Sequence, residues 1–266
     1  MTMFVREGVR LAYRDTGNGM PVVFQHGLGG DAAQVDDIFP DVPSVRRVTL
    51  ECRGQGQSSF GPADRLSIAT FAEDVDALSE RLEFGAAIVG GISMGAAIAL
   101  RLAVHRAERV RALVLARPAW VTSPAPANMR PYALVGELLG RYAPEEAMRR
   151  FEASEVAAEL RQAAPDNLAS LEGFFSRAEP NAFGELLRAI ATDGPGVSES
   201  QVRGIEVPTL VIGHGRDLAH PLGYAVTLAR LIPGATLKVI TPKAVDRNAY
   251  RQEFRACLAD FLEAVA

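Results

Sequence analysis

The sequence has few cysteines and histidines and no long apolar run. Only two of its 266 residues are cysteines, Cys52 and Cys257, and their separation matches no metal-ligand spacing. No apolar run reaches the roughly 18 residues that suggest a transmembrane helix, and the N-terminus lacks a basic and then apolar signal region. We therefore expect a cytoplasmic protein that needs no metal and no cofactor.

Lysine is also scarce, and no run of like charge occurs. The 28 basic residues include only two lysines, Lys238 and Lys243, a bias typical of a GC-rich coding genome. The net charge of −4 and the isoelectric point near 5.7 argue against nucleic acid as the main partner. We expect a small-molecule substrate as the partner and no membrane association, while homo-oligomer formation stays open.

Short apolar runs alternate with helical periodicity along most of the chain. A β-hairpin is predicted at the N-terminus, where apolar and polar residues alternate around Glu7-Gly8. Six further runs suit strands that are buried on both faces. They cover residues 21–25, 46–51, 86–90, 110–116, 207–213 and 235–241. This order predicts a doubly wound, mostly parallel α/β sheet with right-handed crossovers.

One stretch interrupts the alternation. Residues 122–202 contain helical segments but no convincing strand, and they begin with the linker-like "TSPAPANMRP". We expect residues 1–121 and 203–266 to form the core, with 122–202 as a helical cap insertion over the sheet edge. The cap is rich in aromatic residues, which predict either an apolar pocket lining or a core of its own: Tyr132, Tyr142, Phe151, Phe174, Phe175 and Phe183.

The segment "GGISMGAAIAL" places Ser93 on a sharp turn between an apolar strand and a helix of small residues. Gly91 and Gly95 relieve crowding in such a turn. A serine in this position looks like a nucleophile, and the helix N-terminus favours negative charge that develops beside it.

Three other motifs accompany "GISMG" along the chain. They are "HGLGG" (26–30), "ECRGQGQSS" (51–59) and "PTLVIGHGRDLAHP" (208–221). Together with "GISMG", they resemble the α/β-hydrolase fold family over essentially the whole chain. The resemblance implies an oxyanion hole made by the backbone N–H groups of Leu28 and Met94. It also implies that Asp217 is the acid of a catalytic triad, and that Glu51 shapes a turn.

The resemblance fails at the catalytic histidine, which this family places in the loop before the last helix. That loop reads "ITPKAVDRNAY", and no histidine follows His220. A serine needs a base to become nucleophilic at neutral pH. His220, three residues after Asp217, is the first candidate, and Lys243 and Asp246 are alternatives. His105 lies too far along its helix, His26 is expected to be structural, and His214 stays open.

We therefore predict a hydrolase of a small carboxylic ester or lactone that uses Ser93, Asp217 and His220. Family members also include lyases and cofactor-free oxygenases, so the reaction is less certain than the fold. A different class of function is also open, because loss of the histidine is what a small-molecule binding protein would show. The sequence gives little support to a dinucleotide site, since "GLGG" lacks the full phosphate-binding pattern.

Overall fold

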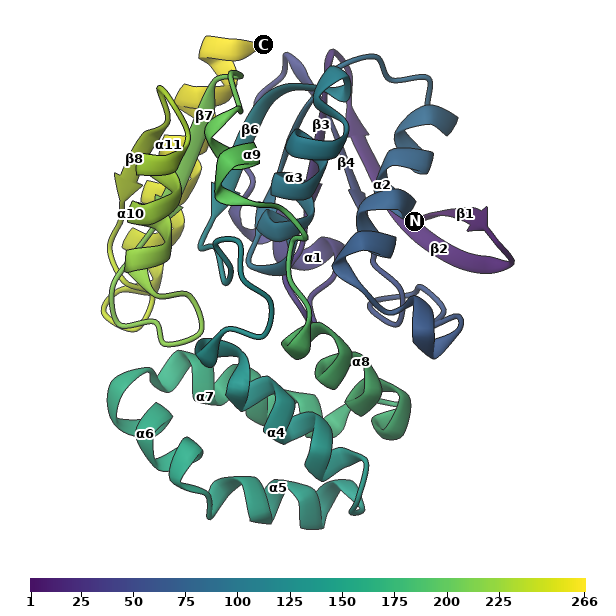
Figure 1. Ribbon diagram of the computed structural model, residues 1–266, viewed down its shortest axis with the longest axis vertical. Coiled ribbons are helices and arrows are strands. Elements are labelled where there is room, and N and C mark those ends of the chain that lie inside the picture. Colours follow the sequence, from purple (N-terminus) through teal and green to yellow (C-terminus); the bar gives the residue numbers. More distant parts are fainter.

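The computed structural model describes residues 1–266 and is built around a single eight-stranded sheet (Figure 1). The strand order is β1-β2-β4-β3-β5-β6-β7-β8. The pairs β1–β2 and β2–β4 are antiparallel and all others are parallel, which confirms the predicted hairpin and the mostly parallel sheet. The strands are β1 (Thr2–Arg6), β2 (Val9–Gly17), β3 (Met20–Gln25), β4 (Val45–Leu50), β5 (Ala87–Ile92), β6 (Val110–Ala116), β7 (Thr209–Gly213) and β8 (Thr236–Val239).

Helices cover both faces of this sheet because each carries an apolar stripe. On one face, α1 (Ala32–Ile38) and α11 (Arg247–Val265) share a buried cluster with residues of β3 and β6. On the other face, α2 (Ile68–Arg81), α3 (Met94–His105) and α10 (Leu222–Leu231) belong to the larger core cluster. No helix combines the length and the apolarity that crossing a bilayer would require.

The chain between β6 and β7 contains helices and no strand. Figure 1 shows α4 to α8 as a separate layer beyond one end of the sheet. Helices α4 and α8 pack closely there. A Cβ atom on Gly136 would lie only 2.6 Å from the carbonyl oxygen of Gly184. The helices are α4 (Arg130–Leu139), α5 (Pro144–Glu152), α6 (Glu155–Ala163), α7 (Pro165–Glu172), α8 (Pro180–Thr192) and α9 (Glu199–Arg203). Four short 3-10 helices span Ala63–Arg65, Ala107–Arg109, Ala127–Met129 and Gly173–Ser176.

One prediction about burial was wrong. The last strand, β8, lies at the sheet edge and is mostly exposed, whereas its apolar run predicted burial on both faces. Cys257 is only half-buried, because the stripe that α11 buries consists of Tyr250, Phe254, Leu258 and Leu262.

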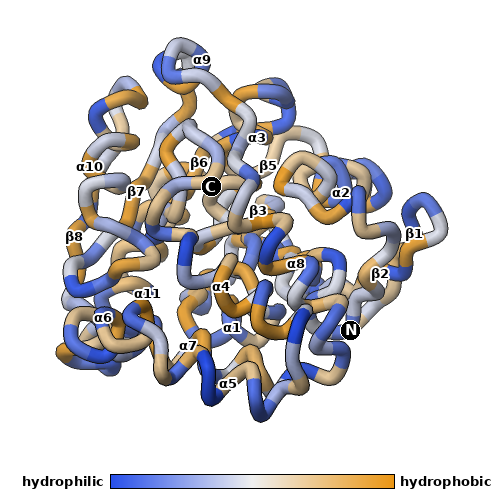
Figure 2. Tube along the Cα trace, turned by 60° about the horizontal axis from the view of Figure 1, so that its bottom comes forward, coloured by the Kyte–Doolittle hydropathy of each residue, from blue (hydrophilic) through white to orange (hydrophobic).

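Figure 2 shows hydrophilic segments on outer elements such as α5.

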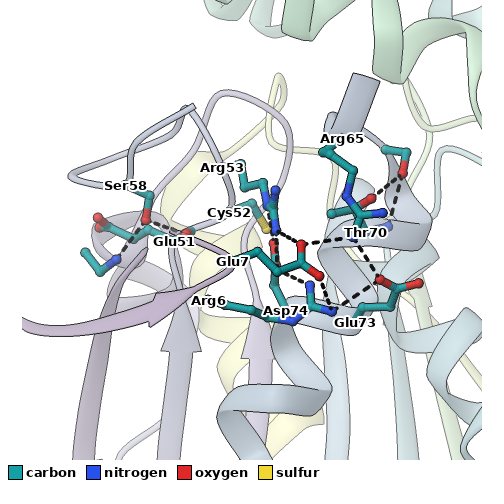
Figure 3. A network of polar contacts seen from close by, with 12 residues as sticks. Arg6, Glu7, Glu51, Cys52, Arg53, Ser58, Arg65, Thr70, Glu73 and Asp74 are labelled. Carbon is teal, nitrogen blue, oxygen red and sulfur yellow. Dashed lines mark hydrogen bonds and ion pairs between the residues drawn. The ribbon is translucent and has the colours of Figure 1, made fainter. Parts of the chain in front are cut away.

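A buried ion pair fixes the segment between β4 and α2. Arg53 donates to both carboxylate oxygens of Asp74, at 2.7 and 2.8 Å, and each side chain is only 1% exposed. Arg6 of β1 donates to the same carboxylate at 2.7 Å (Figure 3). In the same segment, Glu51 accepts hydrogen bonds from the N–H groups of Ala32 and Gln57. The motif around Glu51 therefore orders a turn.

We expect Asp74→Ala to reduce the free energy of unfolding by about 3–5 kcal/mol, because it leaves the buried Arg53 guanidinium with only the exposed Glu7 carboxylate, 3.5 Å away, as counter-charge. Urea denaturation followed by circular dichroism measures the change. The matched control is Glu80→Ala on the same helix, which removes an exposed pair with Arg109 and should cost less than about 1 kcal/mol. Equal losses in the two variants would contradict a structural role for the buried pair.

Candidate functional site

Ser93 occupies a tight turn between β5 and α3. Its backbone is in a region that non-glycine residues rarely adopt, with φ 58° and ψ −113°. The strand and the helix approach so closely that a Cβ on Gly91 would lie 2.5 Å from the carbonyl carbon of Gly95. A Cβ on Gly95 would lie 2.4 Å from the carbonyl oxygen of Gln25. Both glycines are therefore needed for this turn, as the sequence predicts.

Two backbone N–H groups beside Ser93 have no acceptor within the protein. In the loop after β3, the N–H groups of Gly27, Gly29 and Gly30 all donate, at 2.7 to 2.9 Å. The N–H of Leu28, between them, donates to nothing. Met94 begins α3, so its N–H has no acceptor within the helix. The two amides predicted to form an oxyanion hole thus have no acceptor within the protein.

The loop after β7 brings Asp217 and His220 together. The imidazole Nδ1 of His220 lies 2.9 Å from both carboxylate oxygens of Asp217, and the His220 backbone N–H donates to one of them. Because a carboxylate only accepts, Nδ1 carries the proton and Nε2 keeps its lone pair. This geometry is that of a base oriented by an acid.

Arg117 completes this cluster, and sequence reasoning missed it. Its guanidinium donates to Asp217 Oδ2 through Nε at 3.0 Å and through a terminal nitrogen at 2.6 Å. The same terminal nitrogen lies 3.1 Å from His220 Nδ1. Arg117 directly follows β6 and has a positive φ of 46°. Its position at the carboxyl end of a buried parallel strand was the one signal that could have identified it.

These contacts set the charges in the cluster. Burial opposes ionisation of Asp217, but the neighbouring His220 and Arg117 outweigh it and hold the pKa of the carboxyl well below its usual range. Burial is also the main reason why the pKa of His220 is lowered, and Arg117 lowers it further while Asp217 opposes the shift. His220 is therefore neutral at pH 7.

Ser93 and His220 face the same cavity of about 250 Å³. No hydrogen bond joins Ser93 Oγ to His220 Nε2. One wall comes from the loops at the carboxyl ends of the strands, and the other from α4, α7 and the residues that follow it. The lining residues are Gly27, Leu28, Gly29, Gly30, Gln34, Ile92, Ser93, Arg117, Tyr132, Asp166, Asn167, Ser170, Phe174, Arg177, His220 and Lys243.

The other candidate bases have different surroundings. Lys243 lines the cavity, whereas Asp246 does not. The carboxylate of Asp246 caps α11 by accepting from the N–H groups of Asn248 and Ala249. Asp246 therefore has a structural role at the helix start.

The remaining histidines lie outside the cavity wall. His26 is fully satisfied, because Nδ1 donates to the carbonyl of Gly27 and Nε2 accepts from the N–H of Cys52. His105 is exposed near the carbonyl of Gly196. His214 donates from Nδ1 to the next carbonyl, and its Nε2 lies 3.5 Å from Asp217. Only His220 combines contact with the acid and access to the cavity.

The aromatic residues of the cap divide between the two predicted roles. Tyr132 and Phe174 line the cavity. The buried Phe151, Phe175 and Phe183 form part of the cap core, and Tyr142 is exposed. Charged and polar groups make up most of the cavity wall, so the aromatic residues of the cap supply only part of its lining. Nowhere in the chain do three or more His, Cys, Asp or Glu side chains gather in a way that could hold a metal ion.

Curated proteins with similar sequences include hydrolases. The AB hydrolase superfamily protein YisY of Bacillus subtilis is 30% identical over 244 residues, which cover 87% of each chain. The 2-hydroxymuconate semialdehyde hydrolase of Pseudomonas sp. (strain CF600) is 30% identical over 252 residues, covering 88% of this chain and 83% of the relative.

Solved structures share the fold at lower sequence identity. The enol-lactonase of Burkholderia xenovorans LB400 superposes with a TM-score of 0.73 at 23% identity, covering 98% of this chain and all of the other. A thermophilic esterase of Thermogutta terrifontis gives a TM-score of 0.70 at 23% identity, covering 98% and 97%. A family model described as the alpha/beta hydrolase fold matches residues 20–244. The chain therefore belongs to the α/β hydrolase fold family.

Proposed function

We propose that this protein hydrolyses a small carboxylic ester or lactone, with Ser93 as nucleophile, His220 as general base and Asp217 as the orienting acid. The observation that supports it best is the 2.9 Å contact between His220 Nδ1 and Asp217, since His220 lines the same cavity as Ser93. The proposed base comes from the loop after β7, whereas the family pattern places it after β8.

In the proposed reaction, His220 Nε2 takes the proton of Ser93 Oγ as that oxygen attacks the carbonyl carbon. The resulting oxyanion accepts hydrogen bonds from the N–H groups of Leu28 and Met94. His220 then returns the proton to the leaving alkoxide, which leaves an acyl group on Ser93. A water molecule, deprotonated by His220, attacks the acyl carbon, and His220 returns this proton to Ser93 Oγ as the acyl–oxygen bond breaks and the carboxylic acid leaves. Catalytic hydrogen bonds are often formed only with substrate bound, which fits the absence of a Ser93–His220 bond here.

Arg117 has a positioning role in this scheme. By donating two hydrogen bonds to Asp217, it keeps the carboxylate ionised and fixes the direction of its lone pairs. Its positive charge also disfavours protonation of His220, so that the base stays neutral to lower pH. The relatives support the reaction class, since their names include a semialdehyde hydrolase and an enol-lactonase.

One alternative is a small-molecule binding protein. It is favoured by the missing Ser93–His220 hydrogen bond and by the occurrence of Lys243 and Ala244 where the family pattern has its histidine. A binding protein would be stabilised by its ligand without turning it over. The available amides of Leu28 and Met94 favour the hydrolase, because binding alone does not require an oxyanion hole.

We expect a fluorophosphonate to add once to the native protein and not at all to Ser93→Ala, because only an activated serine reacts. Intact-mass spectrometry measures the adduct. His220→Ala should slow labelling about 10²–10⁴-fold, the usual contribution of a general base.

Two controls identify the nucleophile and the base. Ser170→Ala removes the other serine of the cavity wall and should leave the adduct in place. Lys243→Met should also keep the adduct, because Lys243 is not the base in this proposal. An adduct that disappears in Lys243→Met but persists in His220→Ala would assign the base to Lys243 instead.

The pH dependence of ester hydrolysis provides a further test. Because the pKa of His220 is lowered from about 6.5, its neutral form persists below that pH. We expect kcat/KM to stay constant down to pH 6.5 and to fall only in more acidic solution. Initial rates from pH 4.5 to 8 measure the profile, and an acidic limb centred above 6.5 would be inconsistent with His220 as described.

Replacement of Arg117 by methionine should raise the pKa of His220, because a neighbouring positive charge is lost. Proton NMR measures it well, since the chain has only four histidines and His105 is an exposed internal reference. Arg117→Lys should keep most of the native value. The matched control is Arg111→Met, an exposed position on β6, the strand that Arg117 follows. An unchanged pKa in Arg117→Met would remove Arg117 from the mechanism.

A further inference from the structure

The cavity wall carries more positive than negative charge. Three cations line it, Arg117, Arg177 and Lys243, against the single carboxylate of Asp166. The charge of Arg117 is already neutralised by its ion pair with Asp217, a residue that does not line the cavity. Two cations and one carboxylate therefore act on a ligand, so the cavity has a net positive potential.

Lys243 is the cation with the fewest partners. It lies in the loop between β8 and α11 and is half-buried, yet its ammonium group makes no hydrogen bond and no ion pair within 4 Å. Its environment disfavours the charge, since burial and the nearby Arg117 lower the pKa of Lys243. An anionic group of a ligand in the cavity would supply this half-buried ammonium with a charged acceptor.

Arg177 adds positive charge from the cap side. One terminal nitrogen donates to the carbonyl oxygen of Gly29, and the guanidinium lies 5.8 Å and 5.2 Å from the ring centres of Phe174 and Phe183. These contacts hold the side chain in place, while its other N–H groups have no acceptor in the protein. Asp166 pairs with neither cation, and its Oδ2 is buried without a hydrogen bond.

We propose that Lys243 binds a carboxylate of the substrate, with Arg177 strengthening the positive field. The substrate is then a small ester or lactone that carries a second, ionised carboxyl group. This inference rests on the proposed hydrolase function. The cavity of about 250 Å³ limits the substrate to a short acyl chain between the ester and the carboxylate.

The test compares esters that differ only in charge. Mono-methyl esters of succinate, glutarate and adipate are assayed beside the corresponding amides, in which a neutral carboxamide replaces the free carboxylate. We expect at least one acid to be preferred over its amide by about tenfold or more in kcat/KM, the usual effect of a charged hydrogen bond. Lys243→Met should abolish the preference mainly through a higher KM, because the contact is the same in ground and transition states.

The matched control is Lys238→Met, which removes the only other lysine, at an exposed position on β8. It should keep the native preference. In parallel, calorimetry on Ser93→Ala measures binding of succinate, glutarate and adipate against their diamides, with and without Lys243→Met. This readout does not depend on catalysis.

The outcomes separate the two proposals. Ester hydrolysis without any preference for the acids would overturn the carboxylate site and leave the hydrolase function standing. Binding of a dicarboxylate that is lost in Lys243→Met, with no ester hydrolysed, would support the site and overturn the hydrolase. If the protein neither binds a dicarboxylate nor hydrolyses an ester, both proposals are overturned.

Discussion

The buried carboxylate of Asp217 is the group on which the rest of the site depends. It accepts from the Arg117 guanidinium, from the His220 imidazole and from a backbone N–H, and these donors offset the cost of burying its charge. Each donor is fixed in turn by this common acceptor. The orientation of the proposed base and the position of Arg117 are therefore consequences of one buried charge.

Sheet topology explains why these residues meet. The central strands β3, β5, β6 and β7 run parallel, so their carboxyl ends lie at one edge, where ligands bind in open α/β sheets. The loops that follow them carry Leu28, Ser93, Arg117 and Asp217. The helical layer then closes the cavity from the other side, and Phe174 packs so near Gly29 that a Cβ there would lie 2.4 Å from its ring. The cap and the oxyanion loop are thus in direct contact.

The polarity of the cavity distinguishes this site from an apolar ester pocket. Aromatic residues of the cap mostly stabilise the cap itself, while arginine, lysine, aspartate and asparagine face the ligand space. Asn167 shows how polar residues also serve the structure, because its side-chain oxygen accepts from the N–H groups of Leu218 and Ala219. It thereby ties the cap to the loop that carries Asp217 and His220.

The sequence alone predicted the mostly parallel sheet of the core and the turn at Ser93, because periodicity and glycine spacing act over a few residues. The amides of Leu28 and Met94 were implied by the resemblance of the motifs to the α/β-hydrolase family. The sequence also indicated His220, through its short distance from Asp217 along the chain. It could not identify Arg117, which is 100 residues away from its partner Asp217. Nor could it reveal the exposure of β8 or the lining by Arg177. Those features depend on which distant segments pack together, and only the tertiary structure decides that.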